Sequence, residues 1–270
     1  MNKIYKAKAF FQRDWIIETS YKMAFLLSIL ASLFPIVSFF FIGKMMEGRE
    51  NPSLDQYGGS YFPFVLIGLA FTRFFQLAIT TFSNTMRRAQ MAGCLEAILS
   101  SQTDSRLVVL FSSLYSFGAA TFQLIIMFAI GTLFLGFSFG QTNFPAMFLA
   151  ILLSLIVFVS FGILAAAGTI IFKKGEPFSW FFVTASGILA GAFFPVEIMP
   201  EWLQAIAYLV PITYSLDALR LSMLEGQGIA MLSEQLLILA ITGAVLLPLS
   251  LQFFKWSVEK GKRDGSLVHY

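Results

Sequence analysis

Residues 107–172 read LVVLFSSLYSFGAATFQLIIMFAIGTLFLGFSFGQTNFPAMFLAILLSLIVFVSFGILAAAGTIIF, sixty-six positions without Asp, Glu, Lys, Arg or His. A helix rises about 1.5 Å per residue, so this run could extend for roughly 100 Å, whereas the hydrocarbon core of a bilayer is about 30 Å thick. Gly, Asn and Pro gather in its middle, at 136–145 (GFSFGQTNFP), which is typical of a turn. We therefore predict two membrane helices, over 107–136 and 145–172, joined by a short loop.

The composition of the whole chain agrees with this interpretation. Of 270 residues, 57% are hydrophobic and 12% are charged, and the mean hydropathy of +0.78 is typical of proteins that cross a membrane several times. Cys94 is the single cysteine, which excludes an internal disulfide and a cysteine-based metal cluster. His269 is the single histidine, so a histidine-based catalytic or metal site is not expected. No basic patch is interleaved with aromatic residues, so nucleic acid is not an expected partner.

Six crossings account for all the apolar segments of the chain, including the two already described. We predict spans over 23–43, 61–81, 107–136, 145–172, 178–194 and 235–254. Arg73 interrupts the second of these, and Pro248 is expected to kink the sixth. The charged N-terminal 22 residues lead directly into a full span, which is unlike a cleaved signal peptide.

Lysine and arginine predict the orientation. Fourteen of the 18 Lys and Arg residues fall on the side that holds both chain ends, three fall on the other side, and Arg73 lies within a span. Because Lys and Arg accumulate on the cytoplasmic side, both termini are expected to be cytoplasmic. The same asymmetry favours an even number of spans.

Two short segments on the predicted inner side have helical apolar spacing. In residues 2–22, Ile4, Phe11 and Trp15 share one face while Lys8 and Arg13 lie elsewhere, which predicts an amphipathic helix along the inner interface, or a simple anchor. In the loop 85–106 (TMRRAQMAGCLEAILSSQTDSR), the apolar positions at helical spacing are Leu95, Ile98 and Leu99. Such a face needs lipid or protein against it. A loop that only links two spans remains the alternative.

The predicted outer segment 197–234 is divided by prolines, with Pro195, Pro200 and Pro211 separating pieces at 201–210 and 213–224. Each piece is too short to cross a bilayer, and its apolar residues need burial, among them Trp202, Leu203, Ile206 and Leu209. We expect a pair of re-entrant helices that caps the outer mouth. Asp217 and Arg220 are three residues apart and are expected to form a local, exposed ion pair of little energetic weight.

Several kinds of chemistry have no motif in this sequence. It contains no G-x-x-x-x-G-K-[ST], no H-E-x-x-H and no G-x-S-x-G. The predicted span centres hold no Asp or Glu, which argues against a proton-driven secondary transporter, although a channel or secondary transporter remains a rival function. A membrane-embedded enzyme, the other rival, would need a cluster of polar groups that we do not find. The chain itself is not expected to be an enzyme or to bind a metal or cofactor.

The segment GAFFPVEIMPEWLQAIAYLVPITYSLDALR (191–220) resembles the outer-mouth signature of bacterial type-2 ABC transporter permeases. That family shows G-x-x-F-P, then a P-x-W-L-Q helix, an N-or-L-P-x-T-Y turn and an A-L-R end, and almost every element is present here. Residues 93–99 (GCLEAIL) resemble the coupling segment G-T-L-E-x-L-L of the same family, with Cys94 in place of the common Thr. The resemblance covers essentially the whole chain in span order.

The resemblance implies roles for particular residues. The coupling helix, which would sit in a groove of a separate ATPase subunit, comprises Gly93, Cys94, Leu95, Glu96, Ala97, Ile98 and Leu99. Glu96 would contact the ATPase or cap its helix. The interface helix, which would touch the same ATPase, includes Phe11, Arg13 and Trp15. The outer gate would contain Phe193, Phe194, Pro195, Pro200, Trp202, Pro211 and Tyr214.

Three further features concern the interior of the membrane. Arg73 is the single charge deep in a predicted span, and Gln76 lies one turn further on the same face. The two could line a pathway and meet an anionic substrate group, or Arg73 could pair with a carboxylate or with helix-end carbonyls. The small residues Gly162 and 165–168 (AAAG) are expected to allow close helix packing. Most of the 32 Phe residues are expected to face lipid or pack in the interior.

The expectation is thus an all-α membrane protein with one permease domain over 1–270. It comprises the interface helix at 1–22, four spans within 23–172, and two spans with the re-entrant pair and a cytoplasmic tail within 173–270. The resemblance implies a bacterial plasma membrane, a second permease copy as a homodimer partner, and separate ATPase subunits that bind ATP and Mg²⁺. The expected cargo is an amphipathic drug-like or lipid-like molecule, or alternatively a polysaccharide or lipid-linked glycan.

Overall fold

The computed structural model describes residues 5, 8–9, 11–12, 15–16, 22–48, 52–91, 93, 105–111, 113–172, 187 and 189–263. Throughout these residues the regular structure is helical, without strands, which confirms the all-helical part of the predicted fold class. The helices are α2 (Lys22–Met46), α3 (Pro52–Asp55), α4 (Tyr61–Met91), α6 (Ser105–Phe111), α7 (Leu114–Phe134), α8 (Phe144–Phe172), α10 (Glu201–Ala207), α11 (Pro211–Leu224) and α12 (Ser233–Arg263), with a 3-10 turn, η1 (Val196–Ile198).

Four of these helices, α4, α7, α8 and α12, are long and apolar enough to cross a membrane. The apolar part of α2 that can be assessed, Leu33–Met46, is shorter. The break predicted within the uncharged run is present, because α7 ends at Phe134 and α8 begins at Phe144. Gly136 lies between them with φ of 74°, a conformation that glycine adopts without strain.

Several predicted boundaries were wrong. The segment expected as one span from residue 107 is divided into α6 and α7, because the chain turns at Ser113. The helices that hold the second and sixth predicted spans are longer than those spans: α4 continues through Arg87 to Met91, and α12 continues through the charged residues to Arg263. Pro248 lies inside α12, which is helical on both sides of it. Most of the fifth predicted span, 178–194, lies outside the described residues.

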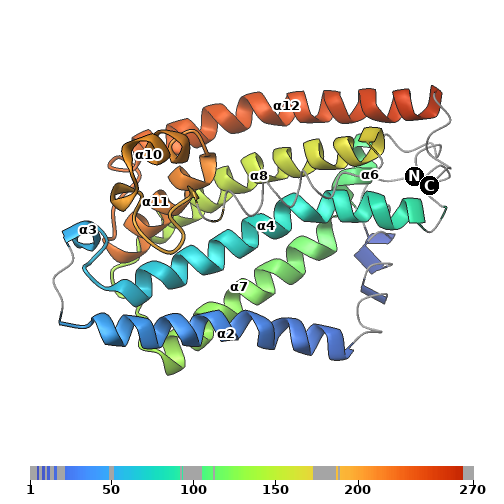
Figure 1. The fold of residues 1–270 in the computed structure, drawn as a ribbon. Helices are drawn as coiled ribbons and strands as arrows, with labels where there is room; N and C mark the ends of the chain where they lie inside the picture. Colours follow the sequence, from blue (N-terminus) through green and yellow to red (C-terminus); the bar gives the residue numbers. More distant parts are fainter. Residues whose placement is uncertain are drawn as a thin grey trace.

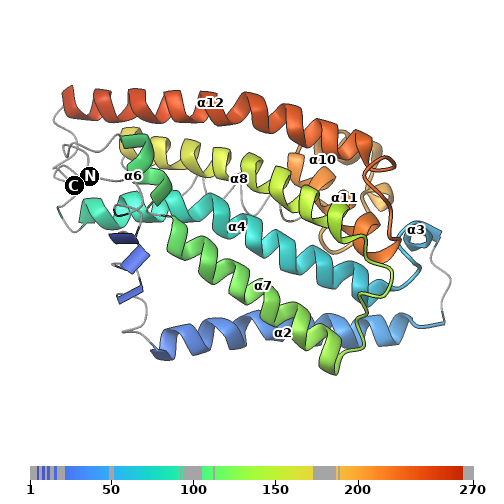
Figure 2. The same cartoon turned by 180° about the vertical axis from the view of Figure 1, so that it is seen from behind.

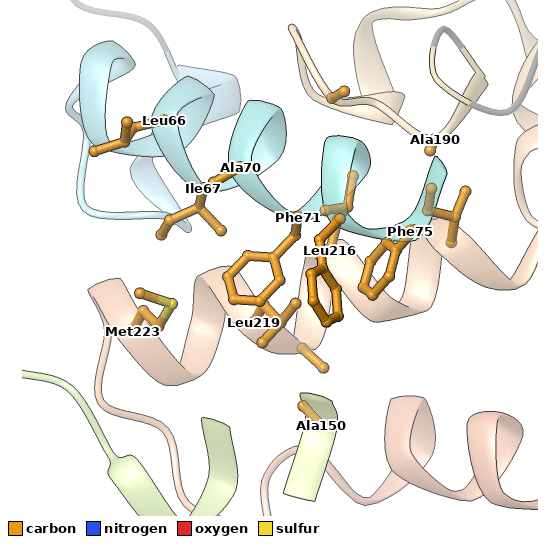
Figure 3. Packing of buried hydrophobic residues seen from close by; sticks show 14 of the residues in the cluster. Leu66, Ile67, Ala70, Phe71, Phe75, Ala150, Ala190, Leu216, Leu219 and Met223 are labelled. Carbon is orange, nitrogen blue, oxygen red and sulfur yellow. The ribbon is translucent and has the colours of Figure 1, made fainter. Parts of the chain in front are cut away.

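Helix α4 is the centre of the bundle, because it packs against α2, α7, α8 and α11 (Figure 1). It runs parallel to α8, since Phe75 stacks on Phe158 with ring centroids 4.1 Å apart and Gly162 lies against Ala78. Helices α2 and α7 run antiparallel to it, and α12 runs parallel to α8 on the other side. Figure 3 shows the α4 side chains Ile67, Phe71 and Phe75 meeting Leu216 and Leu219 of α11. The largest buried cluster therefore joins the bundle to the short helices.

Small residues allow α4 and α8 to approach closely, as predicted. Ala166 and Ala167 of α8 are fully buried. A Cβ placed on Gly162 would lie 2.6 Å from the carbonyl oxygen of Ala78 and 2.5 Å from Cδ2 of Phe82. Close backbone approach raises the van der Waals contact between helices, which is the main attraction available inside lipid.

The two ends of the bundle differ in composition. Helices α3, α10 and α11 gather at one end, which we call the hairpin end (Figures 1 and 2). The opposite end, which we call the basic end, holds the start of α2 and the ends of α4, α8 and α12. Its described Lys and Arg residues include Lys22, Arg87, Arg88, Lys255, Lys260, Lys262 and Arg263. The long apolar helices thus connect a basic end with an end built from short helices.

Replacement of Gly162 by Ala should destabilise the protein. The added methyl group meets the Ala78 carbonyl, which belongs to a helix backbone and cannot move aside, so we expect a loss of about 1–3 kcal/mol. Gly118→Ala in α7 is the matched control, since a Cβ added there would have no heavy atom within 4 Å outside its own helix turn. Thermal unfolding of both variants in one detergent should give a lower midpoint for G162A alone; equal midpoints would contradict the packing described.

Candidate functional site

Prolines divide the hairpin end into short helices, as the sequence predicts. Pro195 and Pro200 adopt extended backbone directly before η1 and α10, and Pro211 occupies the first turn of α11. Proline fixes φ near −65° and has no N–H to lose, so it suits the first turn of a helix. We call η1, α10 and α11, over residues 196–224, the outer hairpin, a name taken from the outer position that the sequence predicts for this segment.

Arg220 of α11 is the central contact of this region. Its side chain is 2% exposed, and Nη2 donates hydrogen bonds to the carbonyl oxygens of Gly191 at 2.9 Å and Ala192 at 3.0 Å. Its Nε donates to the carbonyl oxygen of Phe64 at 3.3 Å, and its guanidinium lies 3.5 Å from the centroid of the Phe64 ring. One side chain therefore ties α11 to α4 and to the segment that precedes the outer hairpin.

The sequence-based expectation for Arg220 was wrong. An exposed ion pair with Asp217 was expected, whereas the guanidinium is buried and its hydrogen bonds all go to backbone carbonyls. Burial lowers the pKa of Arg220 to about 10, so the group stays protonated at neutral pH. A buried cation is stable only where its N–H donors meet acceptors. Here three backbone carbonyls accept hydrogen bonds from Arg220, and the face of the Phe64 ring lies against its guanidinium.

Close backbone approach accompanies the arginine contact. A Cβ on Gly68 of α4 would overlap the Ala192 carbonyl oxygen and would lie 2.6 Å from Nη2 of Arg220. Gly191 has φ of 67°, in the left-handed region that favours glycine. Both glycines are therefore required by the path of the chain between residues 189 and 195.

Asp217 joins two other elements. Its Oδ1 accepts a hydrogen bond from the Tyr57 hydroxyl and its Oδ2 accepts one from Nε2 of Gln235, both at 2.8 Å. Burial raises the pKa of Tyr57 above its ordinary value, and the Asp217 charge raises it further, so the phenol remains a neutral donor. Tyr57 was not singled out from the sequence. The available signal was one aromatic residue in an otherwise small and polar stretch, 51–60 (NPSLDQYGGS).

The residues predicted as an outer gate all lie at the hairpin end, but their side chains do not pack into one cluster. Phe193 stacks on Phe39 of α2 with centroids 5.4 Å apart, and Phe194 is 37% exposed. Pro195 is buried, Pro200 is exposed, and Pro211 and Tyr214 are half-buried.

The side chains of α10 and the turn after it that were expected to be buried are divided in the same way. Leu203 packs on Val196 and Met199, whereas Trp202, Ile206 and Leu209 are exposed on this chain. Trp202, for example, is 67% exposed, so the outer face of α10 needs lipid or a further protein surface.

A cavity of about 200 Å³ opens beside Arg220 and Asp217. Its lining combines hydroxyl, carboxylate and amide groups, namely those of Tyr57, Tyr208, Thr213, Tyr214, Glu197, Asp217, Glu234 and Gln235. Such a lining can exchange hydrogen bonds with a polar molecule. Among the residues that the structure describes, no three His, Cys, Asp or Glu side chains gather as metal ligands would.

A second polar feature lies along the middle of α4. Arg73 and Asn84 are exposed and Gln76 and Thr80 are half-buried, at spacings of three and four residues that place them on one helix face. We call these four residues the α4 stripe. Gln76 lies next to Gly187, since its Nε2 would be 3.3 Å from a Cβ there. The structure thus brings Arg73 and Gln76 onto one helix face, as the sequence predicted.

The predicted ATPase-contacting residues are described only in part. Phe11 and Trp15 are helical, and their rings lie 5.8 Å and 6.1 Å from the ring of Tyr115, which is in the first turn of α7. Gly93 is exposed in a turn, with φ of 66°. Outside the described residues lie Arg13, Cys94, Leu95, Glu96, Ala97, Ile98 and Leu99.

Two comparisons with known proteins bear on this arrangement. A family model described as "ABC-2 type transporter" matches residues 5–224, from the N-terminal segment to the end of α11. Nodulation protein J of Sinorhizobium fredii (strain NBRC 101917 / NGR234) is 25% identical over 232 residues, which is 82% of this chain and 84% of that protein. The family match therefore includes both the outer hairpin and the α4 stripe.

Replacement of Arg220 by Gln should strongly destabilise the hairpin end. The carbonyls of Gly191 and Ala192 would lose their donor, which should lower the free energy of unfolding by about 1–3 kcal/mol for each buried carbonyl. Arg220→Lys should recover only part of this loss, because one ammonium group cannot reproduce the planar fork. Arg263→Gln, at an exposed position in the last turn of α12, should change stability by no more than about 0.5 kcal/mol. Thermal unfolding midpoints measure all three, and an R220Q midpoint equal to that of R263Q would contradict the anchoring role.

Proposed function

The chain belongs to the ABC-2 type transporter family, and we propose that it forms the substrate pathway of an ATP-driven exporter as one half of a dimer. Membership makes it a transmembrane permease, a transport subunit that is not itself catalytic. The observation that carries the proposal is the family match across 5–224, together with an all-helical bundle of apolar spans.

The proposed arrangement has six spans, and the directions of the described helices support it. Gly243 of α12 contacts Ile156 of α8, while Val258 and Phe254 pack with Ile170 and other residues near the end of α8. The two helices are therefore parallel, and both run from the hairpin end to the basic end. A chain that crosses twice in one direction has to return once in between, and the sequence holds one further apolar segment there, 178–194.

The proposed orientation places the basic end in the cytoplasm of a bacterial cell. The described Lys and Arg residues at that end, such as Arg87, Lys260 and Lys262, support this orientation through the preference of cations for the inner side. The hairpin end then faces outward. Both termini would be cytoplasmic, in the inner or plasma membrane.

The proposed mechanism is mechanical. Family members normally work with an ATPase subunit, and ATP and Mg²⁺ would bind to that separate chain. Residues 93–99 would occupy a groove of the ATPase, and the helix containing Phe11, Arg13 and Trp15 would touch the same partner. ATP-driven closure of two ATPases would then move two permeases as rigid bodies. The contact of Phe11 and Trp15 with Tyr115 supports transmission of such a movement to α7.

The proposed outer gate comprises the outer hairpin and the segment 191–195. Arg220 supports this proposal, because it holds that segment against α4 and so links any movement of α11 to the neighbouring span. The exposed face of α10 would meet lipid or the second copy.

The proposed cargo is an amphipathic drug-like or lipid-like molecule. An exposed polar stripe on an otherwise apolar span supports this class, because the two surfaces suit the two parts of such a molecule. A polysaccharide or lipid-linked glycan is the second candidate. The hydroxyl, carboxylate and amide groups that line the cavity beside Arg220 and Asp217 favour it. ATP hydrolysis by the reconstituted complex distinguishes them, since the true cargo class should stimulate it.

The lone cysteine provides a direct test of the proposed coupling. In the native cell membrane, a thiol-specific photo-crosslinker on Cys94 should capture a P-loop ATPase, because this residue would lie in the ATPase groove. The matched control is a Cys94→Ser/Trp202→Cys double variant, whose thiol lies at an exposed position of the hairpin end. It should capture no ATPase.

The same pair of proteins tests orientation. A membrane-impermeant maleimide should label Cys94 in inside-out vesicles only, and the Trp202→Cys thiol in right-side-out vesicles only. Reversed labelling would refute the orientation. Correct labelling without capture of an ATPase, together with transport that follows an ion gradient, would instead favour a secondary transporter or channel.

A further inference from the structure

Arg73 is a cation placed far from either end of a membrane helix. It lies about 18 Å along α4 from Tyr61 and about 27 Å from Met91, at 1.5 Å per residue. Its side chain is exposed, and within the described part of the protein it makes no ion pair or hydrogen bond. A charge at this depth costs about 2.5–3.5 kcal/mol or more when it faces lipid, so it is expected to face water, protein or a ligand.

A carboxylate from a second copy cannot be its partner at this depth. All six predicted spans, 23–43, 61–81, 107–136, 145–172, 178–194 and 235–254, lack Asp and Glu. In a homodimer the opposing subunit has the same sequence, so it offers no acidic side chain within the membrane. Arg73 therefore has no carboxylate of a second copy to pair with at this depth, and an anionic group of the cargo can take that place.

The α4 stripe indicates from which side such an anion would arrive. Gln76, Thr80 and Asn84 continue the polar face from Arg73 toward the basic end. In the other direction the same face carries Leu69 and Leu66, which are apolar and half-buried or buried. The polar side chains on this face of α4 thus extend from the basic half of the helix as far as Arg73, and no further polar position continues the stripe.

The chain lies against α4 at the level of Arg73 and just beyond it. Gly187 lies beside Thr72 and Gln76, which flank Arg73, and the Ala192 carbonyl lies against Gly68, little more than one turn further toward the hairpin end. The Arg220 hydrogen bonds hold that carbonyl in place. Arg73 is therefore the last charged group before the segment that Arg220 anchors.

We propose that Arg73 binds the anionic group, a phosphate or a carboxylate, of the molecule that this permease transports, at the inner side of the closed outer gate. This inference rests on the proposed function and specifies its cargo as an anionic amphiphile. The planar guanidinium forms paired hydrogen bonds with phosphate and carboxylate oxygens, which are strong where water is scarce. The apolar surfaces around the stripe accept the remainder of such a molecule.

Binding of two matched amphiphiles tests the proposal. The full-length permease is reconstituted in phosphatidylcholine nanodiscs, and equilibrium binding of radiolabelled dodecyl phosphate and dodecyl glucoside is measured, with the signal of empty nanodiscs subtracted. We expect the wild-type protein to bind the phosphate about tenfold or more tightly than the glucoside, as charged hydrogen bonds permit. Arg73→Gln should abolish this preference, and Arg73→Lys should retain part of it.

Controls separate this site from general electrostatic attraction and from misfolding. Arg263→Gln removes the same charge from the basic end and should keep the preference. Thermal unfolding identifies any variant that misfolds. If Arg73→Gln misfolds, the comparison is made with the correctly folded Arg73→Lys variant. A preference that survives in R73Q, or that R263Q loses equally, would overturn the proposal.

Lipid is the other source of phosphate, and a third arm of the experiment addresses it. Nanodiscs with added phosphatidylglycerol should leave the binding of dodecyl phosphate within about threefold of its value in phosphatidylcholine, since a tenfold change would need a lipid contact as strong as the proposed one. Complete displacement would assign Arg73 to a membrane lipid and overturn the cargo assignment. Because these measurements need no ATPase, their failure is distinguishable from failure of the Cys94 crosslink, which tests coupling alone.

Discussion

Within a membrane protein, backbone carbonyls outside regular helix need hydrogen-bond donors. Arg220 donates hydrogen bonds to three backbone carbonyls. The segment at Gly191 and Ala192 is not helical, and inside a bilayer its carbonyls would have no water to satisfy them. A lysine could satisfy one or two groups from a single point, whereas the guanidinium reaches three carbonyls and packs its face on Phe64. The outer hairpin can therefore lie against the spans although the segment that leads into it, at Gly191 and Ala192, is not helical.

Together with its packing against α2, α7 and α8, this anchor makes α4 the most buried of the four long apolar helices α4, α7, α8 and α12. One side of it carries the aromatic core with α8 and α7, and another side accepts α11 and the segment 191–192 through Gly68. In the α4 stripe, Arg73 and Asn84 remain exposed, and Gln76 and Thr80 are half-buried. In a soluble protein an exposed polar stripe is ordinary, but on a span it requires a surface other than lipid. The packing that buries α4 thus also determines which of its side chains can meet a passing molecule.

The sequence predicted what depends on composition and local pattern. The turn at 136–145, the proline-divided hairpin and the close approach at Gly162 follow from residue types whose local preferences are strong, and all three are confirmed. Contacts between distant segments could not be predicted in this way. Asp217 and Arg220 are neighbours on a helix, which suggested a local pair, yet Arg220 turns to carbonyls of residues 64, 191 and 192 while Asp217 binds Tyr57 and Gln235. Helix lengths were underestimated for a related reason, because charges end a span but do not end a helix.

Arg220 and Arg73 differ in the groups that their positive charges can bind. Arg220 is buried at a junction, its hydrogen bonds are made within the chain, and its charge stabilises the structure. Arg73 lies little more than one turn beyond the Gly68 contact on the same helix, and it has no counterpart among the described residues. Because both contact regions lie on α4, a shift of the Ala192 segment would also change what lies next to Arg73. If that segment is part of the proposed gate, an anion held at Arg73 would experience its movement without a separate element to relay it, because one helix holds both contacts.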